Sequence, residues 1–352
     1  NGEATFDAIF AAIDGANTYV LIEFFTVKDD DLGGRLVAHL GEAVKRGVSV
    51  HFLYDEIGSG GGGKRLARSL RALGAQVAAF GGPGAWFGRG NINFRNHRKI
   101  VVVDGTSAFV GGHNVADVYL GTDKRLSPWR DTHVALEGPV VLAVQDAWLC
   151  DWTWASDERP ALRWETSARG DARALVLPTG PTSEDPACAL MFASLFAQAT
   201  ERLWITTPYF LPTPDVDLAL RQAAKRGVDV RVLLPCEPDH MVSSLAALVS
   251  LKEHEDSGVR FYRVNEGFLH QKVVLVDDSL ACIGTANLDH RSIRLNFEIS
   301  VLLDGADSAA AVARMLTHDF ASATELTKSE YDSLPLYKKF GARVAWLSAP
   351  LL

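Results

Sequence analysis

The sequence is poor in cysteine and lacks a hydrophobic run long enough to cross a membrane. The four cysteines of this 352-residue chain form no Cys-x-x-Cys pair, so we expect buried free thiols in a reducing compartment. No stretch approaches about 18 consecutive apolar residues, and none is predicted to span a bilayer. No signal-peptide pattern is present either, and the chain begins with Asn1, so we expect a fragment or a processed form.

An excess of basic residues is also missing. The chain has 35 lysines and arginines against 43 aspartates and glutamates, a formal net charge of −8, so we expect no nucleic-acid partner, although a local basic pocket for phosphate is compatible with this charge. No His-x-x-x-His pattern or Cys/His cluster supports a metal, and we predict no metal and no cofactor. With 47% hydrophobic and 22% charged residues, the chain is typical of a globular protein of two ordinary domains or one large one.

One order of strands and helices occurs twice along the chain. In the first half, strands are expected at 18–27 and from 48, with a helix at 32–47 between them. In the second half, the corresponding elements are a strand at 202–211, a helix at 215–227 and a following strand. The agreement is close between AVKRGVSVHFLYD (43–55) and AAKRGVDVRVLLP (223–235). This alternation predicts a duplicated α/β fold with mainly parallel sheets flanked by helices. The polar, proline-containing stretch 156–171 is the expected connection, which predicts an N-terminal repeat over 1–160 and a C-terminal repeat over 171–352.

Each repeat contains the pattern His-x-Lys-x4-Asp, followed by a glycine and an asparagine. The residues are His97, Lys99, Asp104, Gly111 and Asn114 in NHRKIVVVDGTSAFVGGHN (96–114), and His270, Lys272, Asp277, Gly284 and Asn287 in LHQKVVLVDDSLACIGTAN (269–287). Side chains at i and i+2 of a strand share a face, so each histidine and its lysine point into the same space. A single copy would fit a strand end with two solvated polar residues. Two copies at equivalent positions of a duplicated unit predict a shared site.

These residue types suit a phosphodiester substrate. Lysine and asparagine supply charged and neutral donors for phosphate oxygens. Two imidazoles titrate near neutral pH, so one can attack phosphorus while the other donates a proton. A histidine nucleophile divides the displacement into two easier steps through a covalent phosphoimidazole.

The paired motifs resemble those of the phospholipase D superfamily. The segments LIEFF, FLYDEIGS, WRDTHVALEGPVV and LSAPLL are similar to those of bacterial cardiolipin synthases, and the similarity covers essentially the whole chain. The resemblance implies a duplicated phospholipase D-type fold with one active site at the interface of the halves. It also implies that the phospholipid substrate is phosphatidylglycerol. The protein is then expected to associate with a membrane surface, that of the bacterial inner membrane.

The same resemblance implies roles for the motif residues. His97 corresponds to the nucleophile, and His270 to the general acid and then base. The residues expected to bind the phosphate are Lys99, Lys272, Asn114 and Asn287. The motif aspartates, Asp104 and Asp277, complete the predicted catalytic set, although we expect them to fix the local backbone and the lysine geometry rather than to transfer protons.

A downstream carboxylate orients each histidine in the family. The resemblance therefore implies Asp131 in WRDTHV as the partner of His97, and Glu298 in NFEISV as the partner of His270. An ordinary ion pair with Arg130 would explain Asp131 equally well. Thr285 stands where many relatives of the family have serine, and Gly112 fills the matching place in the first half. Both residues are small, so the backbone can approach the phosphate there.

Three other segments allow two interpretations each. GSGGGGKR (58–65) nearly matches a nucleotide-binding P-loop, but Arg65 stands where a serine or threonine would bind Mg²⁺, so four glycines predict a flexible loop near the cleft. The loop 81–95, with Trp86 and Phe87, could dip into a lipid interface or pack on the core. The apolar segment 241–254 could line an acyl-chain entrance or belong to the core.

The expected activity is cardiolipin synthesis, in which a phosphatidyl group passes from one phosphatidylglycerol to another and glycerol is released. A hydrolytic phospholipase D would use the same residues with water as the acceptor. A nuclease of the superfamily would need a basic groove, which the net charge disfavours. A non-catalytic membrane-binding protein would not need both motifs intact.

Overall fold

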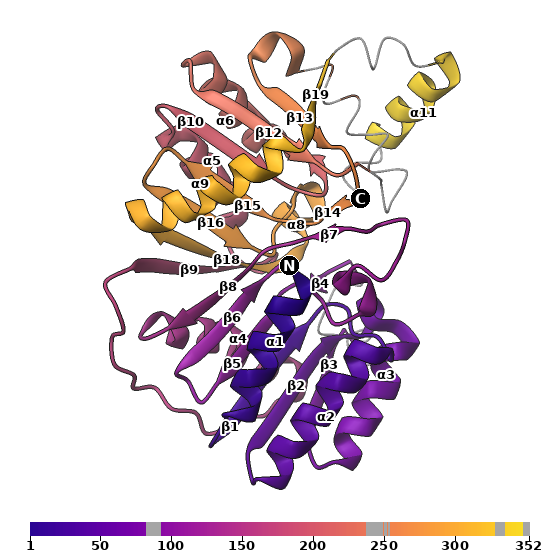
Figure 1. Cartoon of the computed structure of the whole chain (residues 1–352), viewed down its shortest axis with the longest axis vertical. Helices are drawn as coiled ribbons and strands as arrows, with labels where there is room; N and C mark the ends of the chain where they lie inside the picture. Colours follow the sequence, from indigo (N-terminus) through magenta and orange to yellow (C-terminus); the bar gives the residue numbers. More distant parts are fainter. Residues whose placement is uncertain (82–92, 237–248, 250–251, 253, 328–334, 348–352) are drawn as a thin grey trace.

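The computed structural model describes residues 1–81, 93–236, 249, 252, 254–327 and 335–347. The two halves of the sequence form two lobes, the lower and upper parts of Figure 1, and the N-terminus lies where they meet. The predicted lipid-interface residues Trp86 and Phe87, and nearly all of the predicted helix 241–254, lie outside the described residues.

The first lobe is a six-stranded sheet covered by helices on both faces. Its strand order is β3 (Gln76–Phe80), β2 (Ser49–Asp55), β1 (Tyr19–Phe24), β5 (Ile100–Val103), β6 (Ser107–Gly111) and β8 (His133–Glu137). One face packs on α1 (Gly2–Asp14), α2 (Asp31–Lys45) and α3 (Glu56–Ala72), and the other on α4 (Val140–Ser156). Every residue of β1 and β5 is buried for this reason, which explains the continuous apolar run of β5 and a β1 that is apolar except for Glu23.

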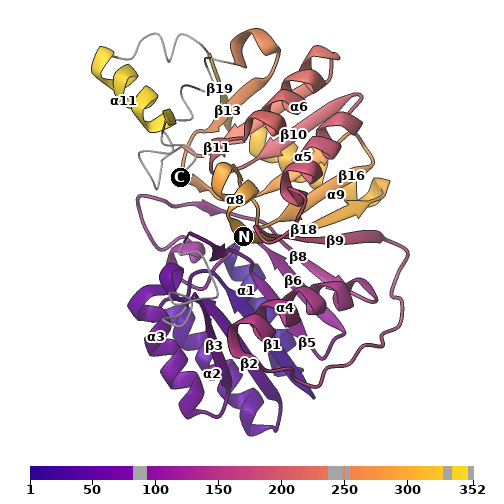
Figure 2. The ribbon, with the colours of Figure 1, turned by 180° about the vertical axis from the view of Figure 1, so that it is seen from behind.

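The second lobe repeats this arrangement around a larger sheet. The order is β19 (Ala323–Leu326), β13 (Arg260–Val264), β12 (Asp229–Leu234), β10 (Arg202–Thr206), β15 (Val273–Val276), β16 (Leu280–Gly284) and β18 (Asn296–Asp304), and β9 (Arg173–Thr179) also pairs with β18. The helices α5 (Ala187–Gln198) and α6 (Pro214–Lys225) cover one face, and α9 (Ala306–Ala321) covers the other. Residues 157–172, without helix or strand, carry the chain from α4 to β9 (Figure 2).

Short elements complete the described structure. They are β4 (Arg95–Asn96), η2 (Asp117–Leu120), β7 (Trp129–Arg130), β11 (Phe210–Leu211), η3 (Glu255–Ser257), β14 (Phe268–Leu269), β17 (Leu288–Asp289), α8 (His290–Arg294) and α11 (Leu336–Leu347). Among the described residues, no helix is both long and apolar enough to pass through a membrane. All four thiols are free, but only Cys188 and Cys282 are buried, whereas Cys150 is exposed, so the prediction of buried thiols is wrong for part of the set.

The duplicated α/β fold is confirmed, but the prediction of mainly parallel sheets is wrong. In the first lobe β3, β2 and β1 are parallel, whereas β1–β5, β5–β6 and β6–β8 are antiparallel. The second lobe has the same mixture around β10, β15 and β16. For β5–β6 and β15–β16 the cause is a short turn between the two strands, and a tight turn joins only antiparallel strands.

The glycine-rich segment 58–65 lies within α3, which has a kink at Gly60 (φ +56°), so the prediction of a flexible loop is wrong. Asp55 caps this helix, since its Oδ1 accepts from the N–H groups of Ile57 (3.0 Å) and Gly58 (2.8 Å). A Cβ on Gly58 would lie 2.5 Å from a backbone oxygen of Phe25. The glycine there lets the helix approach the chain after β1 closely, and this packing outweighs the low helix propensity of glycine.

The motif aspartates close the turns that follow β5 and β15. Asp104 and Asp277 both have φ +52°, a left-handed conformation that aspartate tolerates better than most residues. The Asp104 carboxylate accepts from the N–H groups of Asn17, Thr18 and Tyr19. Asp277 does the same at Thr200, Glu201 and Arg202. Each aspartate therefore joins the end of the motif strand to the start of the neighbouring strand, and the predicted backbone role is confirmed.

Replacing Asp277 by alanine is expected to lower the free energy of unfolding by about 2–3 kcal/mol. The loss combines charge-assisted hydrogen bonds with the strain of alanine at positive φ. Asp278→Ala is the matched control, because this side chain is 78% exposed and pairs only with Arg202 among the described ion pairs, and we expect a loss below about 1 kcal/mol. Denaturant unfolding measures both values, and equal losses would contradict the turn-closing role.

Candidate active site

Two short parallel strand pairs join the lobes and carry the histidines. Strand β4 pairs with the start of β18, and β14 pairs with β7. Just beyond these pairs, the His97 N–H donates to the Phe297 carbonyl (2.9 Å) and the His270 N–H to the Arg130 carbonyl (2.7 Å). The backbone of each lobe therefore places its histidine beside an acidic residue of the other lobe, Glu298 near the start of β18 and Asp131 directly after β7.

Each imidazole pairs with a carboxylate of the opposite lobe. His97 Nδ1 lies 2.9 Å from both carboxylate oxygens of Glu298, and His270 Nδ1 lies 2.7 Å from Asp131 Oδ2. The structure thus brings together all four predicted residues but exchanges their partners, and the predicted pairs His97–Asp131 and His270–Glu298 are wrong. The prediction paired each histidine with the next suitable carboxylate along the chain. In the structure, docking of the lobes determines which carboxylate contacts each ring.

The alternative role of Asp131 is wrong as well. Arg130 pairs with Asp319, with its Nε at 3.0 Å and its Nη2 at 3.2 Å from the carboxylate. Asp131 is 1% exposed, and its Oδ1 accepts from the N–H of Thr132 (2.8 Å). Its second oxygen is directed to His270, which fixes the ring orientation.

The two motif lysines occupy equivalent positions. Lys99 Nζ donates to the His97 carbonyl (2.5 Å), and Lys272 Nζ donates to the His270 carbonyl (2.6 Å). Burial, together with the positive charge of Lys272, lowers the pKa of Lys99 to about 7, against the raising effect of Glu298. Two ammonium groups that repel each other in a buried space favour the binding of an anion between them.

Burial keeps the His97 ring neutral. It lowers the pKa of His97 to about 4, although the adjacent Glu298 carboxylate acts in the opposite direction. The pKa of Glu298 is itself lowered, because His97, Lys99 and the Thr285 hydroxyl offset the effect of its burial. A neutral imidazole that donates Nδ1–H to an ionised carboxylate carries a lone pair on Nε2. This is the state that a nitrogen nucleophile needs.

Thr285 and Gly112 contact the carboxylates. The Thr285 hydroxyl donates to Glu298 (2.6 Å), and the Asn296 amide, which the sequence did not reveal, donates to the other Glu298 oxygen (3.1 Å). At the equivalent place in the first lobe, a Cβ on Gly112 would lie 2.0 Å from Asp131 Oδ1. The first lobe therefore has no room for a side chain where the second lobe has a hydroxyl.

The motif asparagines lie next to the site but are bonded within the protein. Asn114 Oδ1 accepts from the Thr26 N–H (3.0 Å), and its Nδ2 donates to the Tyr119 hydroxyl (2.6 Å). Asn287 is 5% exposed and its Oδ1 has no hydrogen-bond partner in the described structure. Burial raises the pKa of Asp289 to about 6, although a hydrogen bond from the Asn287 side chain acts in the opposite direction. Phosphate binding by these two residues stays a prediction.

The aspartates of the two motifs lie away from the histidines. Asp104 follows the far end of β5 from Lys99, and Asp277 follows the far end of β15 from Lys272. Four strand residues separate each pair, a span of roughly 16 Å from lysine to aspartate at the usual rise. Two predictions are therefore corrected: that these aspartates belong to the catalytic set, and that they fix the geometry of the lysines. Their role is to close the turns.

Aromatic rings surround both imidazoles, and the sequence did not reveal them as part of the site. The Phe25 ring makes an edge contact with His97 at 4.9 Å between centroids. The Trp129 and Tyr119 rings lie 5.2 Å and 5.7 Å from that of His270. The proximity of Trp129 to Asp131 in WRDTHV was the one available signal. These rings exclude water from the imidazole–carboxylate pairs and so strengthen them.

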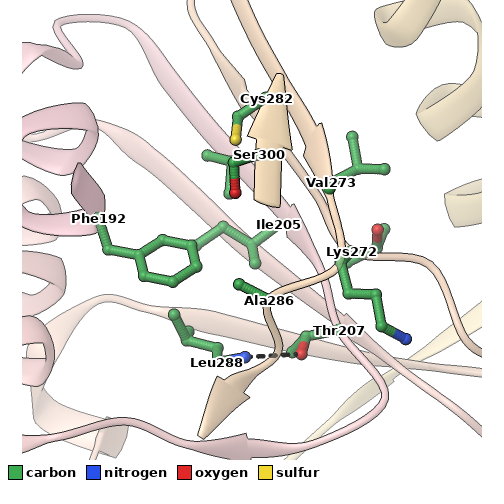
Figure 3. Close-up of a pocket in the computed structure, with 12 residues that line it drawn as sticks. Phe192, Ile205, Thr207, Lys272, Val273, Cys282, Ala286, Leu288 and Ser300 are labelled. Atoms are coloured by element: carbon green, nitrogen blue, oxygen red, sulfur yellow. Dashed lines mark hydrogen bonds between the residues drawn. The ribbon is translucent and has the colours of Figure 1, made fainter. Parts of the chain in front are cut away.

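The lobes differ behind the lysines. The second lobe has a pocket between α5 and the sheet, lined by Lys272, Phe192, Ile205, Cys282, Ala286 and Ser300 among others, and in Figure 3 the Lys272 side chain extends away from Phe192 and Ile205. Strand register makes Ser300 equivalent to His133, since they pair with Gly284 and Gly111 respectively. In the first lobe His113 and His133 occupy this space, with their Nδ1 atoms 3.3 Å apart.

The arrangement can perform nucleophilic and acid–base chemistry on an anion. It offers two imidazoles in defined orientations and two cations that face the same space. Among the described residues, no group of three or more histidine, cysteine, aspartate or glutamate side chains is placed to hold a metal ion.

We expect the His97 imidazole to titrate near pH 4 in the folded protein, because its burial outweighs the attraction of Glu298. Histidine-selective ¹⁵N NMR measures this value, and Glu298→Gln should lower it further, since the carboxylate raises the pKa of the ring. The unfolded chain takes up this proton near pH 6.5. The contribution of His97 to the free energy of unfolding is therefore present above pH 6.5 and is lost as the pH falls toward 4. Titration of His97 near pH 6.5 in the folded state would contradict the buried, neutral ring.

Comparison with known proteins places the chain in a family. The family model described as "Cardiolipin synthase, PLD-like domain" matches residues 9–124 and 192–320. A curated relative, cardiolipin synthase A of Pseudomonas fluorescens, is 48% identical over 353 residues, an alignment that covers 100% of this chain and 74% of the relative. Cardiolipin synthase A of Pseudomonas putida is 47% identical over 354 residues, with coverage of 100% and 74%.

A solved structure supports the fold. Phosphatidylserine synthase from Haemophilus influenzae has a TM-score of 0.72 at 16% identity, covering 100% of this chain and 94% of that one. The whole length of the chain therefore has the duplicated phospholipase D-type fold. Together with the full-length sequence similarity, this confirms the resemblance inferred from the paired motifs, and the chain belongs to the cardiolipin synthase family of proteins with phospholipase D-like domains.

Proposed function

We propose that this chain is a phosphatidyltransferase that makes cardiolipin from two molecules of phosphatidylglycerol and releases glycerol. One observation carries the proposal. Two imidazole–carboxylate pairs, His97–Glu298 and His270–Asp131, are each shared between the lobes, so that one composite site contains two histidines that can take different roles. Full-length similarity to cardiolipin synthases supports the choice of substrate.

In the first step, His97 Nε2 attacks the phosphorus of one phosphatidylglycerol. The bond from phosphorus to the oxygen of the terminal glycerol breaks, and the His270 imidazolium donates its proton to that oxygen. The neutral state of His97 at pH 7 supports its role as nucleophile. The Asp131 carboxylate, 2.7 Å from His270 Nδ1, stabilises the protonated ring.

In the second step, a hydroxyl group of a second phosphatidylglycerol gives its proton to His270 Nε2 and attacks the phosphorus. The bond from phosphorus to His97 Nε2 breaks, and cardiolipin leaves. His270 ends the cycle protonated and His97 neutral, so both return to their starting states. Aromatic rings around both imidazoles support the transfer to a lipid alcohol by excluding water.

We assign the negative phosphate to the space between Lys99 and Lys272. The lowered pKa of Lys99 supports this position, because an anion restores the charged form of a buried lysine. Asn114 and Asn287 are proposed as neutral donors to the same phosphate. Asn114 Nδ2 would then exchange the Tyr119 hydroxyl for a phosphate oxygen.

Hydrolysis is the second candidate, because water could accept the phosphatidyl group from His97 and release phosphatidic acid. Nuclease activity is disfavoured by the net charge of −8. Since phosphatidylglycerol is a membrane lipid, we also propose that the protein works at the surface of the bacterial inner membrane.

We further propose that the two repeats comprise residues 1–160 and 171–352. The absence of helix or strand at 157–172 supports this division, as does the pairing of β9 with β18.

Incubation with phosphatidylglycerol vesicles tests the activity. We expect cardiolipin and glycerol in equal amounts by mass spectrometry, and His97→Ala should reduce the rate at least about 1,000-fold, because it removes the atom that forms the covalent bond. His318→Ala, at an exposed position of α9, is the matched control and should retain the wild-type rate. Phosphatidic acid as the sole lipid product would favour the hydrolase, and an active His97→Ala variant would reject the histidine nucleophile.

A further inference from the structure

Arg98 is a motif residue to which the proposed reaction gives no role. It lies between His97 and Lys99, and strand alternation directs its side chain away from theirs. The residue is 5% exposed. A buried guanidinium needs partners for its five N–H donors.

The guanidinium of Arg98 binds backbone and side-chain oxygens from three elements. Its Nε donates to the Glu298 carbonyl (3.0 Å) on β18, and its Nη2 donates to the Thr179 carbonyl (3.2 Å) on β9. Its Nη1 donates to Asp151 Oδ2 (2.6 Å) and to the Ala147 carbonyl (3.3 Å) on α4. One side chain of the first lobe therefore holds two strands of the second.

The point of attachment is the residue that orients His97. Glu298 and Thr179 are directly opposite each other in the β18–β9 register. Arg98 binds the backbone of Glu298, while the carboxylate of Glu298 binds His97 Nδ1. The Arg98 guanidinium also lies 5.7 Å from the ring centroid of Phe297, whose carbonyl accepts from the His97 N–H. Both contacts that fix the nucleophile therefore end on residues that Arg98 touches.

A buried polar cluster holds Arg98 in this position. Asn96 Oδ1 accepts from the Arg98 N–H (3.0 Å), and Asn96 Nδ2 donates to Asp151 (3.0 Å) and to Glu23. Burial and the nearby Asp151 raise the pKa of Glu23 well above its ordinary value. The guanidinium of Arg98 forms an ion pair with Asp151 within this cluster. Its geometry is fixed by hydrogen bonds on every side.

Among the described residues of the second lobe, the positions equivalent to Arg98 and Glu23 carry no charge. Gln271 stands in place of Arg98, and its Nε2 donates to the Thr132 hydroxyl (2.7 Å). Thr206 stands in place of Glu23, because both face the first residue of the motif strand in register. In the described structure this cluster contacts the surroundings of His97, the ring assigned as nucleophile, whereas Arg130, whose carbonyl accepts from the His270 N–H, pairs with Asp319 instead.

We propose that Arg98 is a positioning residue, which acts through Glu298 to hold the His97 imidazole in line for attack on phosphorus. The inference rests on the proposed function. It deepens that function by naming the group that couples docking of the lobes to the orientation of the nucleophile. In this arrangement Arg98 contributes to turnover without touching the lipid.

The test compares Arg98→Gln and Arg98→Lys with Arg173→Gln. Arg173 is the matched control, because it also joins β9 to β18, through Asp304 at 2.8 Å, but at their far end and with a 78% exposed side chain. We expect kcat for cardiolipin formation to fall about 10–100-fold in Arg98→Gln, the usual cost of removing an outer partner of an oriented histidine. KM for phosphatidylglycerol should stay within about twofold, and Arg173→Gln should retain the wild-type kcat.

A double-mutant cycle separates positioning from general stability. Glu298→Gln alone should lower kcat, and adding Arg98→Gln should lower it by less than about threefold more, because both substitutions release the same ring. Equal losses in the wild-type and Glu298→Gln backgrounds would overturn the inference. A wild-type kcat in Arg98→Gln would also overturn it.

Arg98→Lys keeps the test decisive if Arg98→Gln does not fold. Lysine retains the charge beside Asp151 but cannot reach Glu298, Thr179 and Asp151 together, so kcat should fall at unchanged KM, and a wild-type kcat would overturn the inference. Absence of cardiolipin formation by the wild-type protein would instead reject the proposed function. The two failures are therefore distinguishable.

Discussion

The structure depends on two carboxylates, each of which one lobe supplies to the histidine of the other lobe. Glu298 of the second lobe binds His97 of the first, and Asp131 of the first lobe binds His270 of the second. Each contact buries an acidic group that is at most 1% exposed, and such burial is tolerable only where a partner is present. Docking of the lobes and assembly of the site are consequently one event, supported by short strand pairs on either side.

Burial also divides the chemical roles of otherwise similar residues. A solvated histidine beside a carboxylate would hold its proton at neutral pH, but the His97 ring loses it because the cost of desolvation exceeds the attraction of Glu298. Lys99 is fully buried, and its ammonium faces the repulsion of Lys272. The protein therefore keeps two lysine side chains on rigid strands beside a space that a phosphodiester can occupy.

Much of this could be predicted from the sequence, and the failures have a common cause. The i, i+2 spacing placed His97 and Lys99 on one face, because strand geometry is local. Turn closure by Asp104 and Asp277 was also accessible, since the effect lies within one lobe. The partners of the histidines depend on how the lobes dock, which no local pattern specifies. Strand direction and the helical state of 58–65 were missed because tertiary packing determines both. Arg98 gave a signal that was not used: an arginine on the buried side of a motif strand requires a buried acid.

The differences between Gly112 and Thr285, and between the His113–His133 pair and the Ala286–Ser300 pair, have a consequence for how such a site can diverge. If one repeat formed a symmetric dimer, every substitution would appear beside both histidines at once. A hydroxyl suited to Glu298 would then also be forced against Asp131, where no Cβ fits. Two copies in one chain remove this coupling, so each imidazole can acquire its own surroundings. Covalent duplication thereby allows a nucleophile and a proton carrier to evolve separately from one ancestral motif.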